Sequence, residues 1–341
     1  MDVTQTHTAH DFAHENPLIS CRFDPSGKFV FAGAQDFAVW RWNIETGEKT
    51  KLFTNSWVRG MTFSGDGKSI ITGGTDGRLI WFPVADPAVE GELKPEREIE
   101  GHDGWIRAVA TSSDGKFIAS AGNDLKVKIW NASDGKLIRE LKGHESHIYN
   151  LAFHPDGKHL VSGDLKTNMV VWEFGSGKQV RTWKSENLLN YDKKFLAFIG
   201  GYRGIAFNKD GSQLAGSGIT NVSNAFAGIG NPSVVIFDWK KGAPPLIEHL
   251  SKGALRGVVW GVVLHPEGTI IGAVGGPAGY LLFWKPGEAE DFHRIKLPDT
   301  ARDLNLSPDG LHLATAHYNG HLLIHKMDKK IEEKVEKPEK S

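Results

Sequence analysis

Short apolar runs of four to six residues recur along the chain, and a tight turn separates the first two runs of every repeat. The turn places a polar pair before a glycine, as in DPSGK at 24–28 and SSDGK at 112–116. Glycine after an acid or a serine suits a hairpin because it adopts positive φ without steric cost. The turn occurs seven times, at spacings of 40 to 57 residues, with the glycines Gly27, Gly67, Gly115, Gly157, Gly211, Gly268 and Gly310.

Each repeat carries three apolar runs, and a fourth, more polar run usually follows. In the third repeat these runs lie at 106–111, 117–120, 126–130 and 136–141. Four short antiparallel strands in a repeat of this length form one blade of a β-propeller. We therefore predict an all-β fold, a single seven-bladed β-propeller of four-stranded antiparallel blades, over residues 1–327. The third run of most repeats ends in an aromatic residue: Trp42, Phe82, Trp130, Trp172, Phe237 and Trp284.

The residues around these runs resemble the WD-repeat family, and the resemblance covers nearly the whole chain. That family carries Gly-His before the first strand, Asp between the second and third strands, and Trp at the end of the third. The resemblance implies a hydrogen-bonded network inside each blade, since buried polar groups must find partners. The matching residues are His14, Asp36, Trp42, His102, Asp124, Trp130, His144 and Trp172.

Three positions depart from the family pattern. Lys166 stands where the fourth repeat would carry its aspartate, and Leu255 and Leu297 replace the histidines of the sixth and seventh repeats. We expect apolar packing alone to hold these blades.

The two ends of the chain suggest how the ring closes. After the run at 321–327 only a charged segment, 328–341, remains, and we expect it to form a flexible tail. A β-prone run at 3–9 has no blade of its own. We predict that it supplies the fourth strand of the last blade, which hides an edge that would otherwise invite aggregation.

Composition narrows the function classes. Forty Lys and Arg residues face 41 Asp and Glu residues, so the near-neutral charge argues against a nucleic-acid binder that works through overall basicity. The only cysteine, Cys21, excludes an intrachain disulfide and a Cys-rich zinc site. The first 17 residues lack the apolar run of a signal peptide, and no segment approaches a membrane span. We expect a soluble, cytoplasmic protein with no membrane contact.

One column of residues carries the candidate binding site. It takes the residue four positions before the end of each first strand: Ile19, Arg59, Arg107, Tyr149, Arg203, Trp260 and Arg302. Trp57 and Trp105 stand two positions before two of its arginines. Arg, Trp and Tyr dominate binding hot spots, and an arginine beside an indole can still grip a carboxylate or a phosphate.

The resemblance implies that this column surrounds one mouth of the central channel, on a face often used for partners. We call it the top face. It is formed by the connections that enter the first strands and by the turns between the second and third strands. We predict a non-enzymatic scaffold that binds an acidic or phosphorylated protein segment there. In the alternative structural interpretation, the arginines cap strand ends and pair with acids such as Asp103 or Asp303.

Two insertions, 185–201 and 218–232, belong to the fifth repeat and should emerge on the top face. They form either a docking surface or a lid over the channel. A third insertion, 83–95, is expected to be a long loop on the opposite, bottom face. The apolar residues of the first two insertions are Leu188, Leu189, Tyr191, Phe195, Phe198 and Phe226.

Catalytic and metal sites are weakly supported. Several of the histidines at 7, 10, 14, 312, 317, 321 and 325 should meet in one blade if the ring closes in this way, but no acid sits at a metal-like spacing among the last four. We predict no metal and no cofactor there, only sensitivity to acid. No GxSxG motif is present. The alternative function is a propeller-type hydrolase or metabolite-binding protein with its site at the channel mouth, and nucleic-acid binding ranks third.

Overall fold

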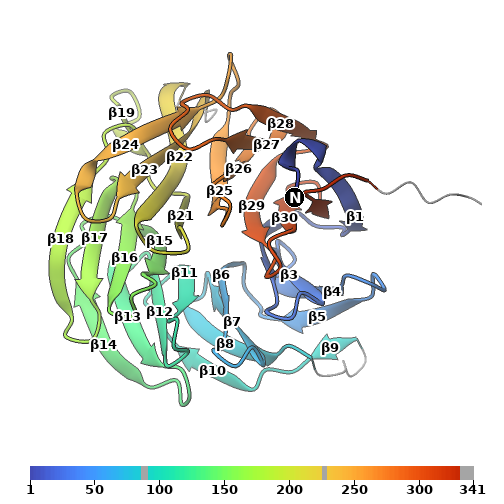
Figure 1. The fold of residues 1–341 in the computed structure, drawn as a ribbon. Helices are drawn as coiled ribbons and strands as arrows, with labels where there is room; N and C mark the ends of the chain where they lie inside the picture. Colours follow the sequence, from blue (N-terminus) through green and yellow to red (C-terminus); the bar gives the residue numbers. More distant parts are fainter. Residues whose placement is uncertain (86–90, 225–228, 331–341) are drawn as a thin grey trace, which may run out of the picture.

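Seven sheets form a ring in the computed structural model (Figure 1), which describes residues 1–85, 91–224 and 229–330. The prediction of a seven-bladed all-β propeller is confirmed. Each blade runs outward from its innermost strand, and the next blade follows along the chain. The seven turn glycines between first and second strands all have positive φ, from 68° to 96°. Glycine recurs at this turn because it adopts the left-handed backbone conformation without steric cost.

The first four blades have regular strands. Blade one holds β2 (Leu18–Phe23), β3 (Phe29–Ala34), β4 (Ala38–Asn43) and β5 (Lys49–Phe53). Blade two holds β6 (Val58–Phe63), β7 (Ser69–Gly74), β8 (Arg78–Pro83) and β10 (Arg97–Glu100). Blade three holds β11 (Ile106–Thr111), β12 (Phe117–Gly122), β13 (Lys126–Asn131) and β14 (Leu137–Lys142). Blade four holds β15 (Ile148–Phe153), β16 (His159–Asp164), β17 (Asn168–Glu173) and β18 (Lys178–Lys184).

The last three blades complete the ring. Blade five holds β21 (Gly204–Phe207), β22 (Gln213–Asn224), β23 (Ile229–Asp238) and β24 (Gly242–Leu250). Blade six holds β25 (Val258–Leu264), β26 (Ile270–Gly275), β27 (Gly279–Trp284) and β28 (His293–Leu297). Blade seven holds β29 (Ala301–Leu306), β30 (His312–His317), β31 (His321–Lys326) and, outermost, β1 (His7–Ala13).

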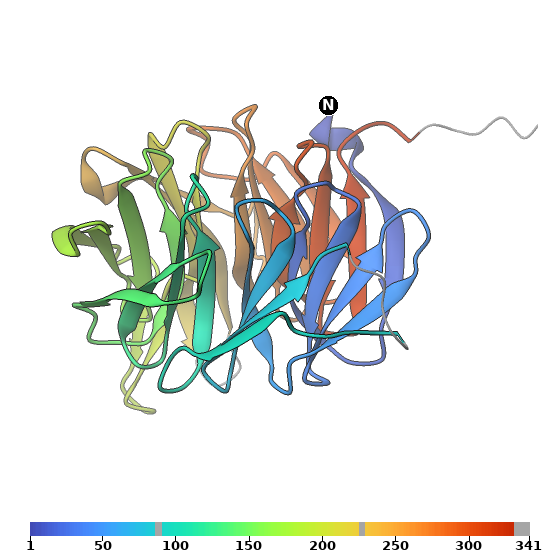
Figure 2. The same ribbon diagram turned by 90° about the horizontal axis from the view of Figure 1, so that it is seen from below.

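Closure by the N-terminal strand is confirmed, but the predicted limits of that strand are wrong. β1 pairs antiparallel with β31 from His7 to Ala13, whereas residues 3–5 form the short 3₁₀ helix η1 (Val3–Gln5). The Asp2 carboxylate accepts a hydrogen bond from the Thr4 backbone N–H at 2.9 Å, which satisfies a free donor at the start of the helix. Val3 is buried against blades six and seven. Helix η1 and the end of β31 lie on the bottom face (Figure 2).

The apolar core lies between neighbouring blades. One cluster joins Ala119 and Ile129 of blade three to Leu151 and Trp172 of blade four, and similar clusters fill other junctions. Each blade therefore depends on its neighbours for burial, as in other repeat proteins.

Three arginines on outer strands bridge successive blades. A guanidinium N–H of Arg97 donates to the Ser133 carbonyl at 2.7 Å, and Arg139 donates to Gly175 at 3.1 Å. Arg181 donates to the Lys240 carbonyl at 2.8 Å and also to Trp239. The three arginines are 42 residues apart, so one repeat position supplies the same link at three junctions.

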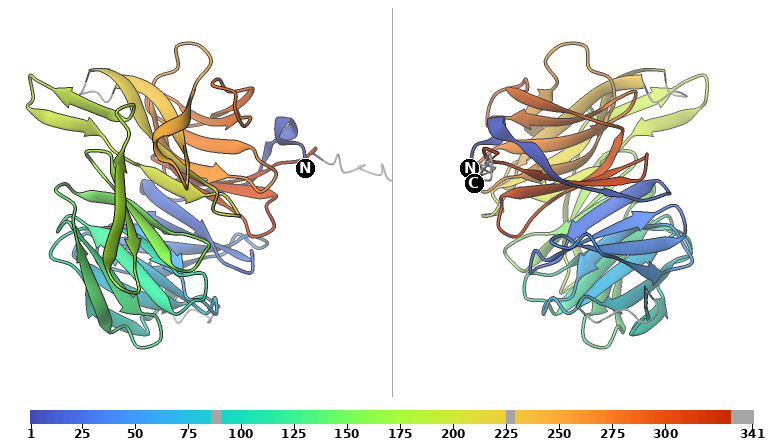
Figure 3. Two further views of the ribbon diagram at one scale, coloured as in Figure 1. Left: turned by 60° about the vertical axis from the view of Figure 1, so that its left-hand side comes forward. Right: turned by 90° about the vertical axis from the view of Figure 1, so that its right-hand side faces the viewer.

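The insertions are more ordered than the predicted loops. Within 83–95, β9 (Glu92–Leu93) pairs in parallel with β5 and becomes a fifth strand of blade one. The insertion at 185–201 contains the hairpin β19 (Leu189–Asp192) and β20 (Ala197–Gly200). β22 and β23 extend into the other insertion, so much of it is strand. Figure 3 shows the β19–β20 hairpin projecting from the ring on the side opposite the N-terminus. Phe226 and the tail from residue 331 lie outside the described residues.

Candidate functional site

The side chains of the blade network bond most completely in blade three. His102 Nδ1 lies 2.9 Å from Asp124, and His102 Nε2 lies 2.7 Å from the Ser120 hydroxyl. Trp130 Nε1 donates to the same hydroxyl at 2.7 Å. We assign the Nδ1–H tautomer to His102, because Ser120 can then donate to Nε2 while it accepts from Trp130. The chain of hydrogen bonds ties the top of the blade to its buried tryptophan.

Blade four repeats this arrangement with an aspartate that the sequence pattern missed. His144 bonds to Asp164 at 2.9 Å and to Ser162 at 2.7 Å, and Trp172 Nε1 donates to Ser162 at 2.8 Å. Lys166 stands at the family position, but Asp164 at the end of β16, two residues earlier, takes the role of the aspartate.

The remaining networks vary. In blade one, His14 and Trp40 both bond to Asp36, at 3.1 and 2.9 Å, while Trp42 packs edge-on against His14. In blade six, Trp284 Nε1 donates to the Leu250 carbonyl at 2.7 Å. Blade seven has its own network of Thr315, His317 and His325. Packing by apolar groups alone was thus a wrong expectation for blades four, six and seven.

Replacing Ser162 by alanine is expected to lower the free energy of unfolding by about 2–3 kcal/mol, because Trp172 Nε1 and His144 Nε2 both lose a buried partner. Urea unfolding followed by tryptophan fluorescence measures the change. Ser176→Ala, in an exposed turn, is the control and should change stability by less than about 0.5 kcal/mol. Equal effects of the two variants would contradict the role of the network.

The column residues owe their orientation to β-bulges in the innermost strands. In six blades the ladder between the first and second strands skips one residue, for example between Val58 and Gly60 or between Ile106 and Ala108. A bulge leaves its extra residue unpaired and re-aims the side chain. Arg203, in the fifth blade, directly precedes β21. The six skipped residues are Ile19, Arg59, Arg107, Tyr149, Trp260 and Arg302.

These side chains meet in one cavity of about 240 Å³ on the top face. All eight residues proposed from the sequence as binding residues line it, together with Ile19 of the same column, and the structure adds Gln35. The side chains of the column residues are half-buried, so they are ordered by neighbours and still reach solvent. The lining residues are Ile19, Gln35, Trp57, Arg59, Trp105, Arg107, Tyr149, Arg203, Trp260 and Arg302.

The aromatic rings hold the guanidinium groups in place. Arg107 lies 4.3 Å from the ring centroids of both Trp105 and Tyr149. Arg203 stacks on Tyr149 at 4.4 Å. Trp260 is approached by three arginines, with Arg302 at 5.0 Å and the other two, Arg59 and Arg203, at 5.2 Å. Cation–π contacts of this kind fix a guanidinium without neutralising it.

None of these four arginines makes an ion pair with a carboxylate in the part of the chain that the structure describes. Arg107 donates to the Asn123 side chain at 2.6 Å, and Arg59 donates to the Ile19 carbonyl at 3.3 Å. The Nε atoms of Arg203 and Arg302 are buried without a protein partner. The alternative pairing with Asp303 is not observed, because that carboxylate binds Arg22 at 2.7 Å.

The pKa values reflect this crowding of positive charge. Burial, together with the neighbouring Arg203, Arg22 and Arg107, lowers the pKa of Arg59 to about 10, against the opposing attraction of Asp303. Burial also lowers the pKa of Arg107 and of Arg302. All of these groups stay charged at neutral pH. The guanidinium groups of Arg59, Arg107, Arg203 and Arg302 therefore form a rim of uncompensated positive charge around the cavity. This arginine rim suits an anion.

The described residues of the fifth-blade insertions lie away from the lining of this cavity. Leu188 is fully buried at the base of the hairpin, and Leu189 is half-buried. Tyr191, Phe195 and Phe198 are exposed, and none of the described insertion residues lines the cavity. The sequence analysis overlooked Leu196, which at 76% is the most exposed large apolar side chain of the described residues. Its place in a run with Phe195 and Phe198 could have marked it.

Metal binding finds no support among residues 1–85, 91–224 and 229–330, where no three His, Cys, Asp or Glu side chains group to hold an ion. The histidines of blade seven bond to protein groups instead. His317 and His325 share Thr315 Oγ1, and His321 lies 2.6 Å from Asp11.

Comparison with known families covers the first half of the chain. The family model described as "WD domain, G-beta repeat" matches residues 3–43, 47–82, 93–131 and 135–173. These segments cover blades one to four, and in blades one, three and four the histidine and tryptophan positions of the family are filled. The chain belongs to the WD-repeat family.

The WD-repeat model matches no segment of blade five, which carries two insertions, or of blade six, where Leu255 replaces the family histidine. No curated protein matches the chain significantly. No helix in the described part of the chain is long and apolar enough to span a membrane. Propellers of the WD-repeat family generally serve as scaffolds for protein interactions.

Proposed function

We propose that this WD-repeat propeller is a non-enzymatic scaffold whose top face binds an acidic or phosphorylated protein segment. The observation that carries the proposal is the rim of four half-buried guanidinium groups, which face one cavity and lack ion-pair partners among the described residues. An acidic side chain or a phosphate supplies the missing negative charge and accepts charge-assisted hydrogen bonds from Arg59, Arg107, Arg203 and Arg302.

The distribution of exposed aromatic residues supports the same face. Phe37 and Tyr318 lie in turns between second and third strands, and Phe53 ends β5 just before the connection to blade two. The other exposed aromatics that the structure describes belong to the β19–β20 hairpin. All therefore sit in top-face connections. Together with Trp57, Trp105, Tyr149 and Trp260 they give a partner apolar area around a charged centre.

The cavity favours this function over the hydrolase considered from the sequence. Its lining residues are arginines, aromatics, Gln35 and Ile19, and they include no carboxylate that could act as an acid, a base or a metal ligand. A protein or peptide partner fits better than nucleic acid, because the chain as a whole is near neutral. A cytoplasmic location is part of the proposal.

The test compares partner capture by the wild type with capture by a variant in which Arg59, Arg107, Arg203 and Arg302 are all glutamate. We expect partners held by the wild type to fall below about a tenth on the variant, because repulsion replaces attraction. A second variant with glutamine at the same positions removes charge with less perturbation of the fold. Circular dichroism and thermal melting establish that each bait is folded.

The matched control carries the same charge change on the bottom face, at four exposed lysines: Lys68, Lys116, Lys136 and Lys178. It should retain the partners. Partners that bind equally to the wild type and to both folded top-face variants would refute the proposed site.

A further inference from the structure

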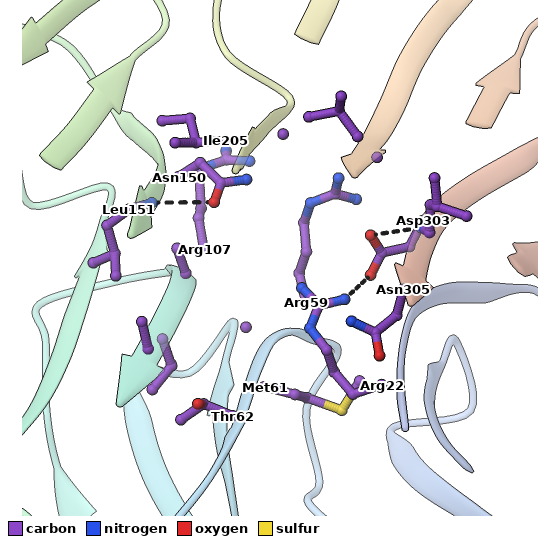
Figure 4. A pocket seen from close by; sticks show the side chains of 18 of the residues that line it. Arg22, Arg59, Met61, Thr62, Arg107, Asn150, Leu151, Ile205, Asp303 and Asn305 are labelled. Carbon is purple, nitrogen blue, oxygen red and sulfur yellow. Dashed lines mark hydrogen bonds and ion pairs between the residues drawn. The ribbon is translucent and has the colours of Figure 1, made fainter. Parts of the chain in front are cut away.

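A larger cavity lies beneath the arginine rim, inside the channel itself. It has a volume of about 420 Å³ and is enclosed by the innermost strands, from β2 and β6 round to β25 and β29. Arg59, Arg107, Arg203 and Trp260 line both this cavity and the one at the mouth. The remaining polar lining, including Arg22, Asn150 and Asn305, faces the channel alone. Figure 4 shows side chains from opposite walls converging on this space.

The channel wall carries an excess of three positive charges. It contains four arginines and a single carboxylate, that of Asp303. Asp303 is already engaged, because its Oδ2 accepts from Arg22 at 2.7 Å and from the Cys21 N–H at 3.0 Å, and its Oδ1 accepts from the Leu304 N–H at 2.9 Å. No carboxylate among the described lining residues therefore remains to neutralise the other three guanidinium groups.

The guanidinium groups are also short of hydrogen-bond acceptors. Arg203 Nε is buried without a partner. Asn150 Oδ1 accepts from the Leu151 N–H at 3.1 Å, and Asn305 Oδ1 accepts from the Phe23 N–H at 2.9 Å, so both side-chain oxygens already serve backbone donors. A buried donor without an acceptor is costly, and several like charges at close range add to the cost. A small anion in the channel would supply both the charge and the acceptors.

We propose that the channel binds a free, compact polyphosphate anion, at a site that lies below the channel mouth and shares Arg59, Arg107 and Arg203 with the proposed partner site. Several guanidinium groups arranged around one space suit tetrahedral phosphate, which presents acceptors in more directions than a planar carboxylate does. The volume is in the range of small-ligand sites. Arg302 and the aromatic residues Trp57, Trp105 and Tyr149 line the mouth cavity alone, so they stay free above the anion.

Isothermal titration with sodium pyrophosphate, at constant ionic strength adjusted with sodium chloride, tests the site. The decisive variant is Asn305→Asp. It is isosteric, keeps the acceptor for the Phe23 N–H, and adds one negative charge to the channel wall. We expect it to weaken pyrophosphate binding by about 10-fold or more. Asn131→Asp is the matched control, since Asn131 Oδ1 also accepts a backbone N–H but lies at the end of β13, outside the channel lining.

Three outcomes would overturn the proposal. The first is that the folded wild type binds no pyrophosphate when the pyrophosphate concentration is raised from 10-fold the protein concentration to about 10 mM. The second is that Asn305→Asp and Asn131→Asp bind pyrophosphate equally. The third is that the protein binds citrate more tightly than pyrophosphate. Loss of binding in Arg302→Gln but not in Asn305→Asp would place the anion at the mouth, which also refutes a separate channel site. Partner capture by Asn305→Asp is measured in parallel. Pyrophosphate binding then reports on the channel site and partner capture on the scaffold, so the failure of either proposal can be recognised separately.

Discussion

Lowering the pH from 7 to 4.5 is expected to reduce the free energy of unfolding by roughly 5 kcal/mol, owing to two histidines of blade seven. Burial lowers the pKa of His317 to about 4, although the Asp299 carbonyl and carboxylate favour its charged form. Burial, with the charge of His317, lowers the pKa of His325 to about 3. In the unfolded chain both side chains take up protons near pH 6.5.

The direction of the pH effect follows from these values. Between pH 6.5 and about 4 the unfolded state binds more protons than the folded state, so acid favours unfolding. The stabilisation is complete above pH 6.5 and falls by about 1.4 kcal/mol per histidine for each pH unit below it. Urea unfolding at pH 7.0, 5.5 and 4.5 measures this slope. The groups that face the pair are Thr8 and His7 from β1, Thr315 from β30, and Asp11 and His321 at the outer edge.

Glutamine at both positions provides the test of cause. The double variant His317→Gln/His325→Gln should lose most of the pH dependence between 6.5 and 4.5, because glutamine does not titrate. His147→Gln, on an exposed top-face loop, is the control and should keep the wild-type slope. If the double variant retains the full slope, the acid sensitivity has another source.

Deleting residues 1–13 is expected to lower the melting temperature by roughly 10 °C or more and to promote aggregation. The deletion removes β1, which pairs with β31 from His7↔Lys326 to Ala13↔His321. It also removes Phe12, which packs against the core between blades seven and one, and it exposes the edge of β31. Thermal melting and light scattering record the two effects.

A synthetic peptide of residues 1–13 supplies the control for the deletion. Added in trans, it should restore part of the lost melting temperature, because β1 pairs with the ring through one strand edge. A peptide of the same composition in scrambled order should not. A truncated chain that melts like the full chain would show that β1 contributes little to closure.

The architecture could be predicted from the sequence because its signal is repeated. The turn glycine recurs in every blade with the same backbone requirement, so seven weak indications add up to a strong one. The limits of β1 were harder to predict. The run at 3–9 is β-prone, but the side chain of Asp2 caps a helical turn there, and the strand starts at His7. Such local side-chain competition is not visible in propensity alone.

The residues that line the mouth cavity could be identified from the sequence by their constant distance from the end of the first strand. Counting back from the strand end works because the same β-bulge recurs in the first strand of six blades. What the sequence could not show is how the charges are distributed in space. The pairing of Arg22 with Asp303 joins residues 281 apart, and it decides which arginines remain uncompensated. Asp164 was missed because it lies two residues before the family position, and only the folded blade brings its carboxylate to His144.

The bulges also separate what a blade must keep from what it can change. In six blades the skipped residue of the first strand makes no ladder pair, so its side chain can be exchanged while the hydrogen bonds on either side persist. Ile19, Tyr149 and Trp260 already occupy the position that elsewhere holds arginine. A substitution in this column therefore changes the surface of the channel mouth and leaves the strands that carry it intact. The binding specificity of the propeller can thus change one residue at a time.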